Sequence, residues 1–286
     1  MHLMQTRISG PFISFGNGWV LFVLKEVRII KMISLQALSY SVGTGHQTSV
    51  FSDLSLSISQ GEFVCIVGPS GCGKSTLFKI IAGLLEPSKG EVMLKAQASS
   101  THTRLGNIAY MPQQDLLLPW RTVIDNCLLP WEVNQVRSKA EAITGIREML
   151  EQFGLAGIEQ AYPHELSGGM KQRVAFLRTV VTGAELLLLD EPFGALDTLT
   201  KREMHKWLIE LWKGLNQTVL MITHDLEEAL LLSDRIYLMS SHSATTPLQE
   251  FKVDLPRPRH HTMNYQPRFL ELREDLEQKI HDTHSF

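Results

Sequence analysis

One glycine-rich stretch has the residue types and the spacing of a phosphate-binding loop. It lies between two apolar runs, 62–67 and 77–82, the first typical of a strand and the second of a helix. Glycines let the backbone curl until several N–H groups point at one phosphate chain, and the helix that follows adds its positive end. The loop comprises Gly68, Pro69, Ser70, Gly71, Cys72, Gly73, Lys74, Ser75 and Thr76.

Two side chains of this loop are expected to act directly on a nucleoside triphosphate. Lys74 would reach the β- and γ-phosphates, and the Ser75 hydroxyl would ligate Mg²⁺. The alternative is a glycine-rich turn that only connects a strand to a helix. The order of strand, loop and helix favours nucleotide binding.

A pair of acids further along the chain supplies what phosphoryl transfer needs besides this loop. Asp190 and Glu191 follow the apolar run 186–189, which is typical of a strand covered on both faces. Asp190 is expected to hold Mg²⁺, and Glu191 to polarise the attacking water as general base. A charged pair that merely ends a strand is the alternative, but it is less expected downstream of a complete phosphate loop.

Two more segments are candidates for contact with phosphate. His224 ends the predicted strand 218–223; a lone histidine is often a core residue, but this strand would share a sheet with the phosphate loop. Ser167, Gly168 and Gly169 begin a predicted helix with uncovered N–H groups, so they form a second candidate anion cap. A plain helix cap is the alternative. Two phosphate cradles so far apart in one chain suggest that two chains sandwich each nucleotide.

The elements that must position these residues alternate between strands and helices. Residues 32–40 and 52–58 alternate apolar and polar, as half-buried strands do, whereas the stretch from about 114 to 183 is helical in character. Strands resume at 186–189, 218–223 and 235–239. The pattern predicts an α/β fold with a mainly parallel wound sheet and an inserted helical subdomain.

Composition limits the class of protein. The chain has 286 residues and a net charge of −3, which gives no basic surface for nucleic acid. Its cysteines are three in number and form no C-x-x-C pair, so a reducing compartment without disulfides is expected; they are Cys65, Cys72 and Cys127.

The two ends of the chain are expected to lie outside the nucleotide-binding domain, 32–245. Residues 1–31 include the longest apolar run, which stops at Lys25 and is too short to span a membrane; Met32 is a plausible natural start. Residues 246–286 are expected to form a tail with a short helix. Four histidines there are expected to be solvated rather than to bind metal: His260, His261, His281 and His284.

Over about residues 32–240 the chain resembles the ATP-binding-cassette (ABC) ATPases, whose motifs occur here in the family's order. The segment Leu-Ser-Gly-Gly-Met-Lys-Gln-Arg at 166–173 is similar to the family's signature motif. The other matches are Tyr40 for the adenine-stacking aromatic, Gly68–Thr76 for Walker A, Gln113 for the Q-loop, Asp190 and Glu191 for Walker B, Ala195–Asp197 for the D-loop and His224 for the switch histidine.

This resemblance implies a P-loop NTPase (RecA-like) fold with an added antiparallel β part, and a competent ATPase that uses ATP and Mg²⁺. Gln113 would contact the metal and the attacking water, while Ser75 and Asp190 complete the metal site. It also implies a head-to-tail homodimer, in which Ser167–Gly169 of one chain close on the nucleotide held by the other.

The resemblance also favours one branch of the family. Few residues separate Gln113 from Ser167, which excludes long coiled-coil arms, and the chain has one cassette without a fused membrane span. A separate ATPase subunit of a bacterial importer is the expected function. A soluble cassette ATPase acting on nucleic acid or ribosomes, and a small-molecule kinase, are the alternatives.

Residues 116–126, 192–197 and 255–259 are similar to the nitrate, sulfonate and taurine group of importers, which includes subunits for thiamine precursors. The expected partners are transmembrane permease subunits and, indirectly, an extracytoplasmic solute-binding protein, with no nucleic acid. The expected location is the cytoplasmic face of the inner membrane. A groove beside Gln113 and 118–120 would receive a short helix of the permease; the alternative is that Leu118 and Trp120 are local core.

Overall fold

The computed structural model describes residues 13–15, 18–20, 31–43, 48–135, 138–214, 217–240 and 248–284. The chain divides into two compact units, Met1–Ile30 and Lys31–Phe286. In the first unit, β1 (Ile13–Phe15) pairs antiparallel with β2 (Gly18–Val20). Most of 1–31 lies outside the described residues, so its exclusion from the fold stays a prediction, as does the boundary between 32–245 and the tail.

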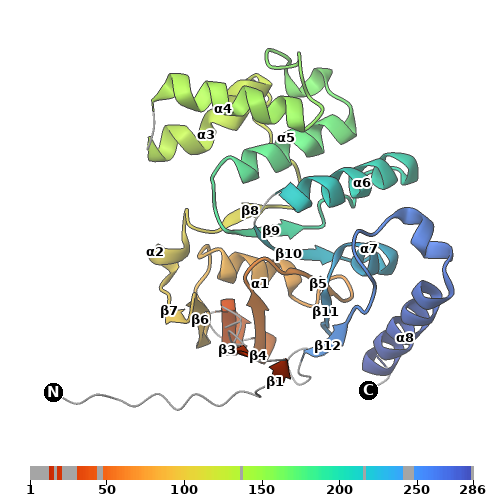
Figure 1. Cartoon of the computed structure of the whole chain (residues 1–286). Coiled ribbons are helices and arrows are strands. Elements are labelled where there is room, and N and C mark those ends of the chain that lie inside the picture. The colour runs from red at the N-terminus through yellow and green to blue at the C-terminus, as the bar shows by residue number, and fades with distance from the viewer. Residues whose placement is uncertain are drawn as a thin grey trace. The chain divides into compact units, whose positions relative to one another are not determined.

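A six-stranded sheet forms the centre of the second unit, in the order β12-β11-β5-β10-β9-β8 (Figure 1). All its pairs are parallel except that of β11 with the edge strand β12, which confirms the wound sheet predicted from the sequence. The strands are β5 (Phe63–Val67), β8 (Ala109–Met111), β9 (Leu186–Asp190), β10 (Thr218–Thr223), β11 (Arg235–Leu238) and β12 (Gln249–Lys252).

The central strands are apolar at every position because the sheet is covered on both faces. In β5, Phe63 and Cys65 join one hydrophobic core, whereas Val64 and Ile66 join the other. The first core is shared with most of the helices, and the second with α1 (Lys74–Ile81) and the antiparallel sheet. A run such as 186–189 therefore lacks the alternation of a half-exposed strand.

A second sheet of four strands is antiparallel, in the order β4-β3-β6-β7. Its strands β3 (Lys31–Val42) and β4 (Thr48–Ser59) alternate buried and exposed residues over much of their length, as their sequences predict. β6 (Lys89–Leu94) and β7 (Gln97–Ala98) complete it. The segment after β7 forms the short helix α2 (Thr101–Arg104), whose Arg104 is buried and donates to the Ile80 carbonyl at 3.2 Å.

Three α-helices and a 3₁₀ turn fill the segment between β8 and β9 (Figure 1). They are α3 (Val123–Asn134), α4 (Lys139–Gln152), η1 (Pro163–Glu165) and α5 (Gly168–Val180). Thr122, Ser138 and Ser167 cap the three α-helices, each accepting a hydrogen bond from a backbone N–H of the first turn. The helical character expected from about 114 to 183 is thus present, with its helices starting at hydroxyl caps.

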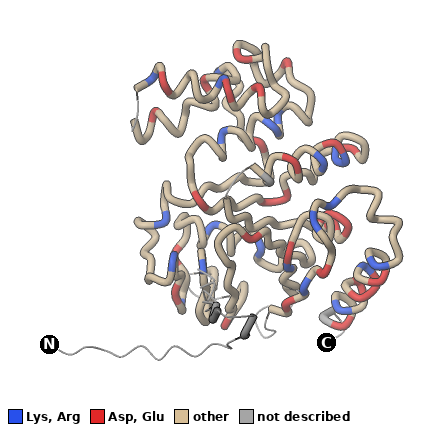
Figure 2. The backbone as a smooth tube through the Cα atoms, viewed as in Figure 1, with Lys and Arg blue, Asp and Glu red and all other residues tan. Residues whose placement is uncertain are grey.

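The remaining helices carry the C-terminal part of the chain. They are α6 (Thr198–Gly214), α7 (Leu226–Leu232), η2 (His261–Tyr265) and α8 (Pro267–His284). Among the described residues, no helix is long and apolar enough to cross a bilayer. Acidic and basic residues are interspersed along the chain (Figure 2).

The expectation of a solvated tail is wrong for its first part. Arg259 is 1% exposed and donates to the Leu230 carbonyl at 2.9 Å, near the end of α7, where carbonyl groups lack helical partners. His261 is half-buried; its ring stacks on His205, and its Nε2 lies 3.1 Å from the Arg202 carbonyl. Among the described residues, no group of three or more histidine, cysteine or acidic side chains is placed to hold a metal.

We expect α8 to contribute to stability through the side of the helix that faces the core. Phe269 is 1% exposed, whereas its neighbour Leu270 is 42% exposed. Phe269→Ala should lower the free energy of unfolding by about 3–5 kcal/mol, because it removes a buried ring and leaves a cavity. Leu270→Ala is the matched control and should cost less than about 1 kcal/mol. Urea unfolding of both variants tests this, and equal losses would contradict the packing of α8.

Candidate nucleotide-binding and catalytic site

The glycine-rich loop joins the end of β5 to the start of α1, as its sequence predicts. Gly73 has φ +102° and caps α1, and a Cβ built there would lie 2.8 Å from the Val50 side chain. A Cβ on Gly68 would lie 2.3 Å from the carbonyl oxygen of Met239. Neither position has room for a larger residue, and glycine at both allows the tight curve of the loop.

Lys74 is held inside this loop. Its side chain is buried, and its Nζ donates to the carbonyls of Gly68 and Pro69, each at 2.7 Å. The Sγ of Cys72 lies 3.9 Å from the same nitrogen. An ammonium group ringed by the backbone of a glycine loop at a helix start fits the phosphates of a nucleotide.

Ser75 and Asp190 meet although they are far apart in the chain. The Ser75 hydroxyl donates to Oδ1 of Asp190 at 3.2 Å. Burial raises the pKa of Asp190, and the hydrogen bonds from Ser75 and Tyr110 partly oppose that shift by favouring the charged form. A hydroxyl and a carboxylate are hard oxygen donors, so this pair fits Mg²⁺.

The three residues predicted to be catalytic converge on one oxygen atom. Oε2 of Glu191 accepts a hydrogen bond from the Gln113 amide at 3.2 Å and lies 3.2 Å from Nδ1 of His224. Glu191 has a positive φ of 46°, a conformation that costs free energy for a residue with a side chain. The strained backbone and the two neighbours hold the carboxylate in place. Gln113 contacts Glu191 rather than Asp190, so its role at the metal stays a prediction.

Tyr40 reaches the site only indirectly. It is half-buried on β3, and its ring centroid lies 6.3 Å from that of Phe51, opposite it on β4. Phe51 in turn is 3.2 Å from the Cβ position of Gly73. Tyr40 therefore packs on Phe51, which borders the loop, and its stacking on adenine stays a prediction.

The helix start predicted at 167–169 is present and lies apart from the phosphate loop, while its binding of an anion stays a prediction. The Ser167 hydroxyl accepts from the Met170 N–H at 3.3 Å, and Gly168 is exposed. A Cβ on Gly169 would lie 2.8 Å from Thr200, so the start of α5 packs closely on the start of α6. Figure 1 shows α5 among the inserted helices, well apart from α1. Within the described chain, these residues and the phosphate loop are thus not brought together.

Two residues that hold the site together escaped sequence reasoning. The Tyr110 hydroxyl donates to Oδ2 of Asp190 at 3.2 Å, and burial raises the pKa of that hydroxyl. Arg178 on α5 donates to the carbonyls of Asp115 and Leu116, just after Gln113. An aromatic residue three positions before Gln113 was the available signal for Tyr110, but any buried strand carries such residues.

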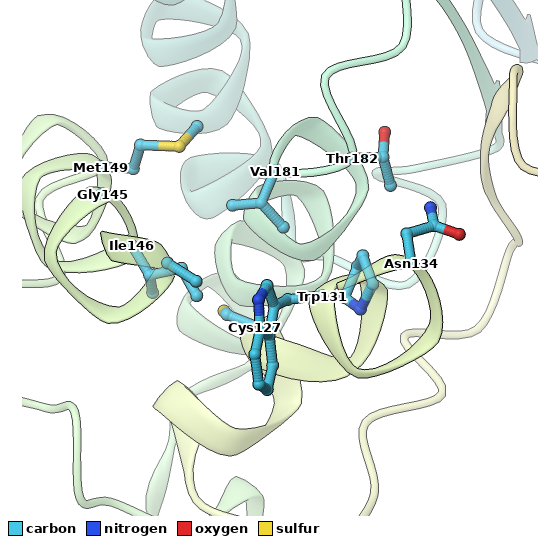
Figure 3. Close-up of a pocket in the computed structure, with 10 residues that line it drawn as sticks. Cys127, Trp131, Asn134, Gly145, Ile146, Met149, Val181 and Thr182 are labelled. Atoms are coloured by element: carbon cyan, nitrogen blue, oxygen red, sulfur yellow. The ribbon is translucent and has the colours of Figure 1, made fainter. Parts of the chain in front are cut away.

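A cavity of about 130 Å³ lies within the inserted helices (Figure 3). Met149 and Ile146 border it from α4, Trp131 and Cys127 from α3, and Val181 from the end of α5. Burial raises the pKa of the Cys127 thiol to about 12, so the thiol is protonated and inert. This cavity contains no predicted site residue and belongs to the packing of the insert.

Comparison with known proteins agrees with this geometry. The family described as ABC transporter matches residues 51–194, from β4 to just beyond Glu191. The chain belongs to the ABC transporter family. It is 41% identical over 251 residues to the formylaminopyrimidine import ATP-binding protein of Halalkalibacterium halodurans, covering 87% of this chain and 95% of that protein. It is 44% identical over 223 residues to an aliphatic sulfonates import ATP-binding protein of Rhodococcus jostii, covering 77% and 84%.

The same family is found among solved structures. The dimeric ATP-binding cassette MJ0796, in a post-hydrolysis state with ADP and phosphate, superposes with a TM-score of 0.69 at 30% identity, covering 79% of this chain and all of that one. The wound sheet with its helical insert is therefore the fold of an ABC ATPase. This chain binds ATP and hydrolyses it.

We expect Glu191→Gln to separate ATP binding from hydrolysis. The amide keeps the shape of the side chain but cannot take a proton from water, so the turnover number should fall by about 10²–10⁴. Binding of a fluorescent ATP analogue should change less than about threefold, because the phosphate loop is intact. Glu185→Gln, at an exposed acid paired with Lys95, is the control and should hydrolyse normally. Turnover above one tenth of the original in Glu191→Gln would contradict the assignment of the base.

Proposed function

We propose that this ABC ATPase is the ATP-hydrolysing subunit of a bacterial importer, and that it energises the uptake of a small organic or inorganic solute through a separate permease. The observation that carries the proposal is the convergence of Gln113 and His224 on Glu191, beside the Ser75–Asp190 pair. In this proposal they supply the water-activating base and the metal-binding pair that one chain contributes to hydrolysis. The similarity to import ATP-binding proteins for formylaminopyrimidine and sulfonates supports the direction of transport and the class of solute.

Each site residue has a task in this proposal. Lys74 and the N–H groups of the loop bind the phosphates of ATP, and Tyr40 stacks on adenine. Ser75, Asp190 and Gln113 hold Mg²⁺, which when bound neutralises phosphate charge. Glu191 takes a proton from the attacking water, while His224 contacts the γ-phosphate and holds Glu191.

A homodimer completes the site. Ser167, Gly168 and Gly169 form a helix start that does not reach the phosphate loop of its own chain; Ser167 and Gly168 are exposed, and Gly169 is buried. In the proposed head-to-tail arrangement they bind the nucleotide held by the other copy, through backbone N–H groups and the positive helix end. The dimeric form of the similar cassette MJ0796 supports this arrangement.

The surface next to Gln113 is the proposed docking site of the permease. A cleft of about 580 Å³ is bordered there by Gln113, Leu116, Gln172 and Ala195, so it touches the Q-loop, α5 and the D-loop. Leu116 is 55% exposed and Trp120 70% exposed, which excludes Trp120 from the local core. A large exposed aromatic, here in the segment that follows the cleft residue Leu116, is typical of a protein interface. Arg178 fixes the backbone between Gln113 and Trp120, because it donates hydrogen bonds to the carbonyls of Asp115 and Leu116.

This function places the chain at the cytoplasmic face of the inner membrane, bound through the permease, with a solute-binding protein as an indirect partner. The alternative of a cassette ATPase acting on nucleic acid or ribosomes has less support. Acidic and basic residues are interspersed (Figure 2), and the net charge is −3, whereas nucleic-acid binding favours a basic stripe.

A tagged pull-down from detergent-solubilised native membranes, with mass spectrometry of what copurifies, tests the proposal. A permease with several membrane spans should be recovered together with this chain. Its companion binding protein then identifies the solute by a direct binding screen. Recovery of soluble partners alone, by a chain with full ATPase activity, would overturn the importer assignment.

We expect Trp120→Asp to uncouple the ATPase from its permease. A carboxylate in place of the exposed ring cannot be buried at an apolar interface without a large desolvation cost, so recovery of the permease and solute uptake should fall at least tenfold. ATP binding should be retained, because Trp120 lies outside the phosphate loop. Val133→Asp, at a position 82% exposed on α3, is the matched control. Normal uptake with Trp120→Asp would remove the docking claim.

A further inference from the structure

Tyr110 lies at the metal-binding acid although no motif assigns it a role. Its hydroxyl donates to Oδ2 of Asp190 at 3.2 Å, while the Ser75 hydroxyl donates to Oδ1 at 3.2 Å. Both oxygens of the carboxylate thus have a donor of their own. Asp190 is 3% exposed, so little water is available to replace either hydrogen bond.

The ring of Tyr110 is held in place by its neighbours. β8 pairs parallel with β9, which sets Tyr110 opposite Leu188, two residues before Asp190. On the other side the ring meets Phe78 of α1 edge to face, with centroids 6.5 Å apart and planes at 77°. Strand pairing and this aromatic contact together aim the hydroxyl at the carboxylate before any metal arrives.

One short segment therefore contacts two consecutive acids. Tyr110 donates to Asp190, and Gln113, three residues later, donates to Glu191. The two acids carry different tasks in the proposed site, metal binding and water activation. The positions of both carboxylate groups therefore depend on one piece of chain, the end of β8 and the turn after it.

We propose that Tyr110 is a positioning residue for the metal-binding carboxylate, which it holds so that Asp190 presents Mg²⁺ with a fixed oxygen. This inference rests on the proposed assignment of Asp190 as a metal ligand. A carboxylate with one donor can turn about its last side-chain bond, whereas donors on both oxygens fix its plane. Loss of such an outer partner typically weakens metal binding 10–100-fold. The competing explanation is that Tyr110 only fills space beside Phe78.

Tyr110→Phe separates these two explanations, because it removes the hydroxyl and keeps the ring that packs on Phe78. Mn²⁺ binding to the protein with saturating ATP, followed by electron paramagnetic resonance, should weaken at least tenfold. The Mg²⁺ concentration for half-maximal ATP hydrolysis should rise by a similar factor, and the turnover number at saturating Mg²⁺ should fall much less. ATP affinity in the presence of EDTA should stay within about twofold, which also shows that the fold is intact.

Tyr237→Phe is the matched control. Tyr237 is a buried tyrosine of β11 in the same sheet, separated from β8 by the strands β5, β10 and β9; its hydroxyl donates to the Ser57 carbonyl and to Glu250, each at 3.2 Å. Its metal dependence should equal that of the unmodified protein. Unchanged Mn²⁺ affinity in Tyr110→Phe, or a loss equal to that in Tyr237→Phe, would overturn the inference.

Asp190→Asn distinguishes failure of this inference from failure of the proposed site. If Asp190→Asn weakens Mn²⁺ binding and Tyr110→Phe does not, Asp190 is a ligand and Tyr110 is not its positioning residue. If Asp190→Asn binds Mn²⁺ normally, the metal site itself is wrongly assigned, and the inference falls with it.

Discussion

Parallel pairing of β5, β10 and β9 is the constraint on which the site depends. The register sets Val67 opposite Thr223, and Ile222 opposite Asp190, so the three strands end at nearly the same level. The next residues of each strand are the phosphate loop, His224 and Glu191. Parallel strands present their carboxyl ends at one edge of the sheet, so the phosphate loop, Asp190, Glu191 and His224 meet there.

A buried polar network holds the backbone on either side of His224 at this edge of the sheet. Glu228 is 3% exposed; its Oε1 lies 2.7 Å from Nε2 of His205, and it accepts a hydrogen bond from the Thr223 hydroxyl. Asp225 caps α7 by accepting from the Glu228 N–H at 3.1 Å, and pairs with Lys201 at 2.7 Å. His224 lies between Thr223 and Asp225 in the chain. Its side chain is 60% exposed and free to meet a phosphate, while the backbone on both sides is anchored.

The sequence predicts the local parts of this site and misses the parts made by the tertiary fold. The phosphate loop and the acid pair 190–191 are predicted because the residues of each are adjacent in the chain and have a characteristic spacing. Tyr110 could not be identified, because its partner lies 80 residues away and the two meet only after β8 pairs with β9. Arg259 was misjudged as part of a solvated tail, since a proline-flanked arginine gives no sign that carbonyls near the end of α7 will receive it.

Helix α5 connects the two surfaces that the proposed dimer and permease would use. It begins at the exposed cap Ser167 and, later in the same helix, Arg178 grips the carbonyls of Asp115 and Leu116. Leu116 has φ +46°, so this stretch of backbone is strained as well as clamped. A helix moves as a rigid rod over such a short length. In the proposed dimer, a displacement of the start of α5 by the nucleotide of the second copy would shift the residues just after Gln113, which border the cleft of about 580 Å³. It would also move Gln113, which donates to Glu191. In the proposed importer, α5 and Arg178 would link the nucleotide held by the second copy to the proposed docking surface.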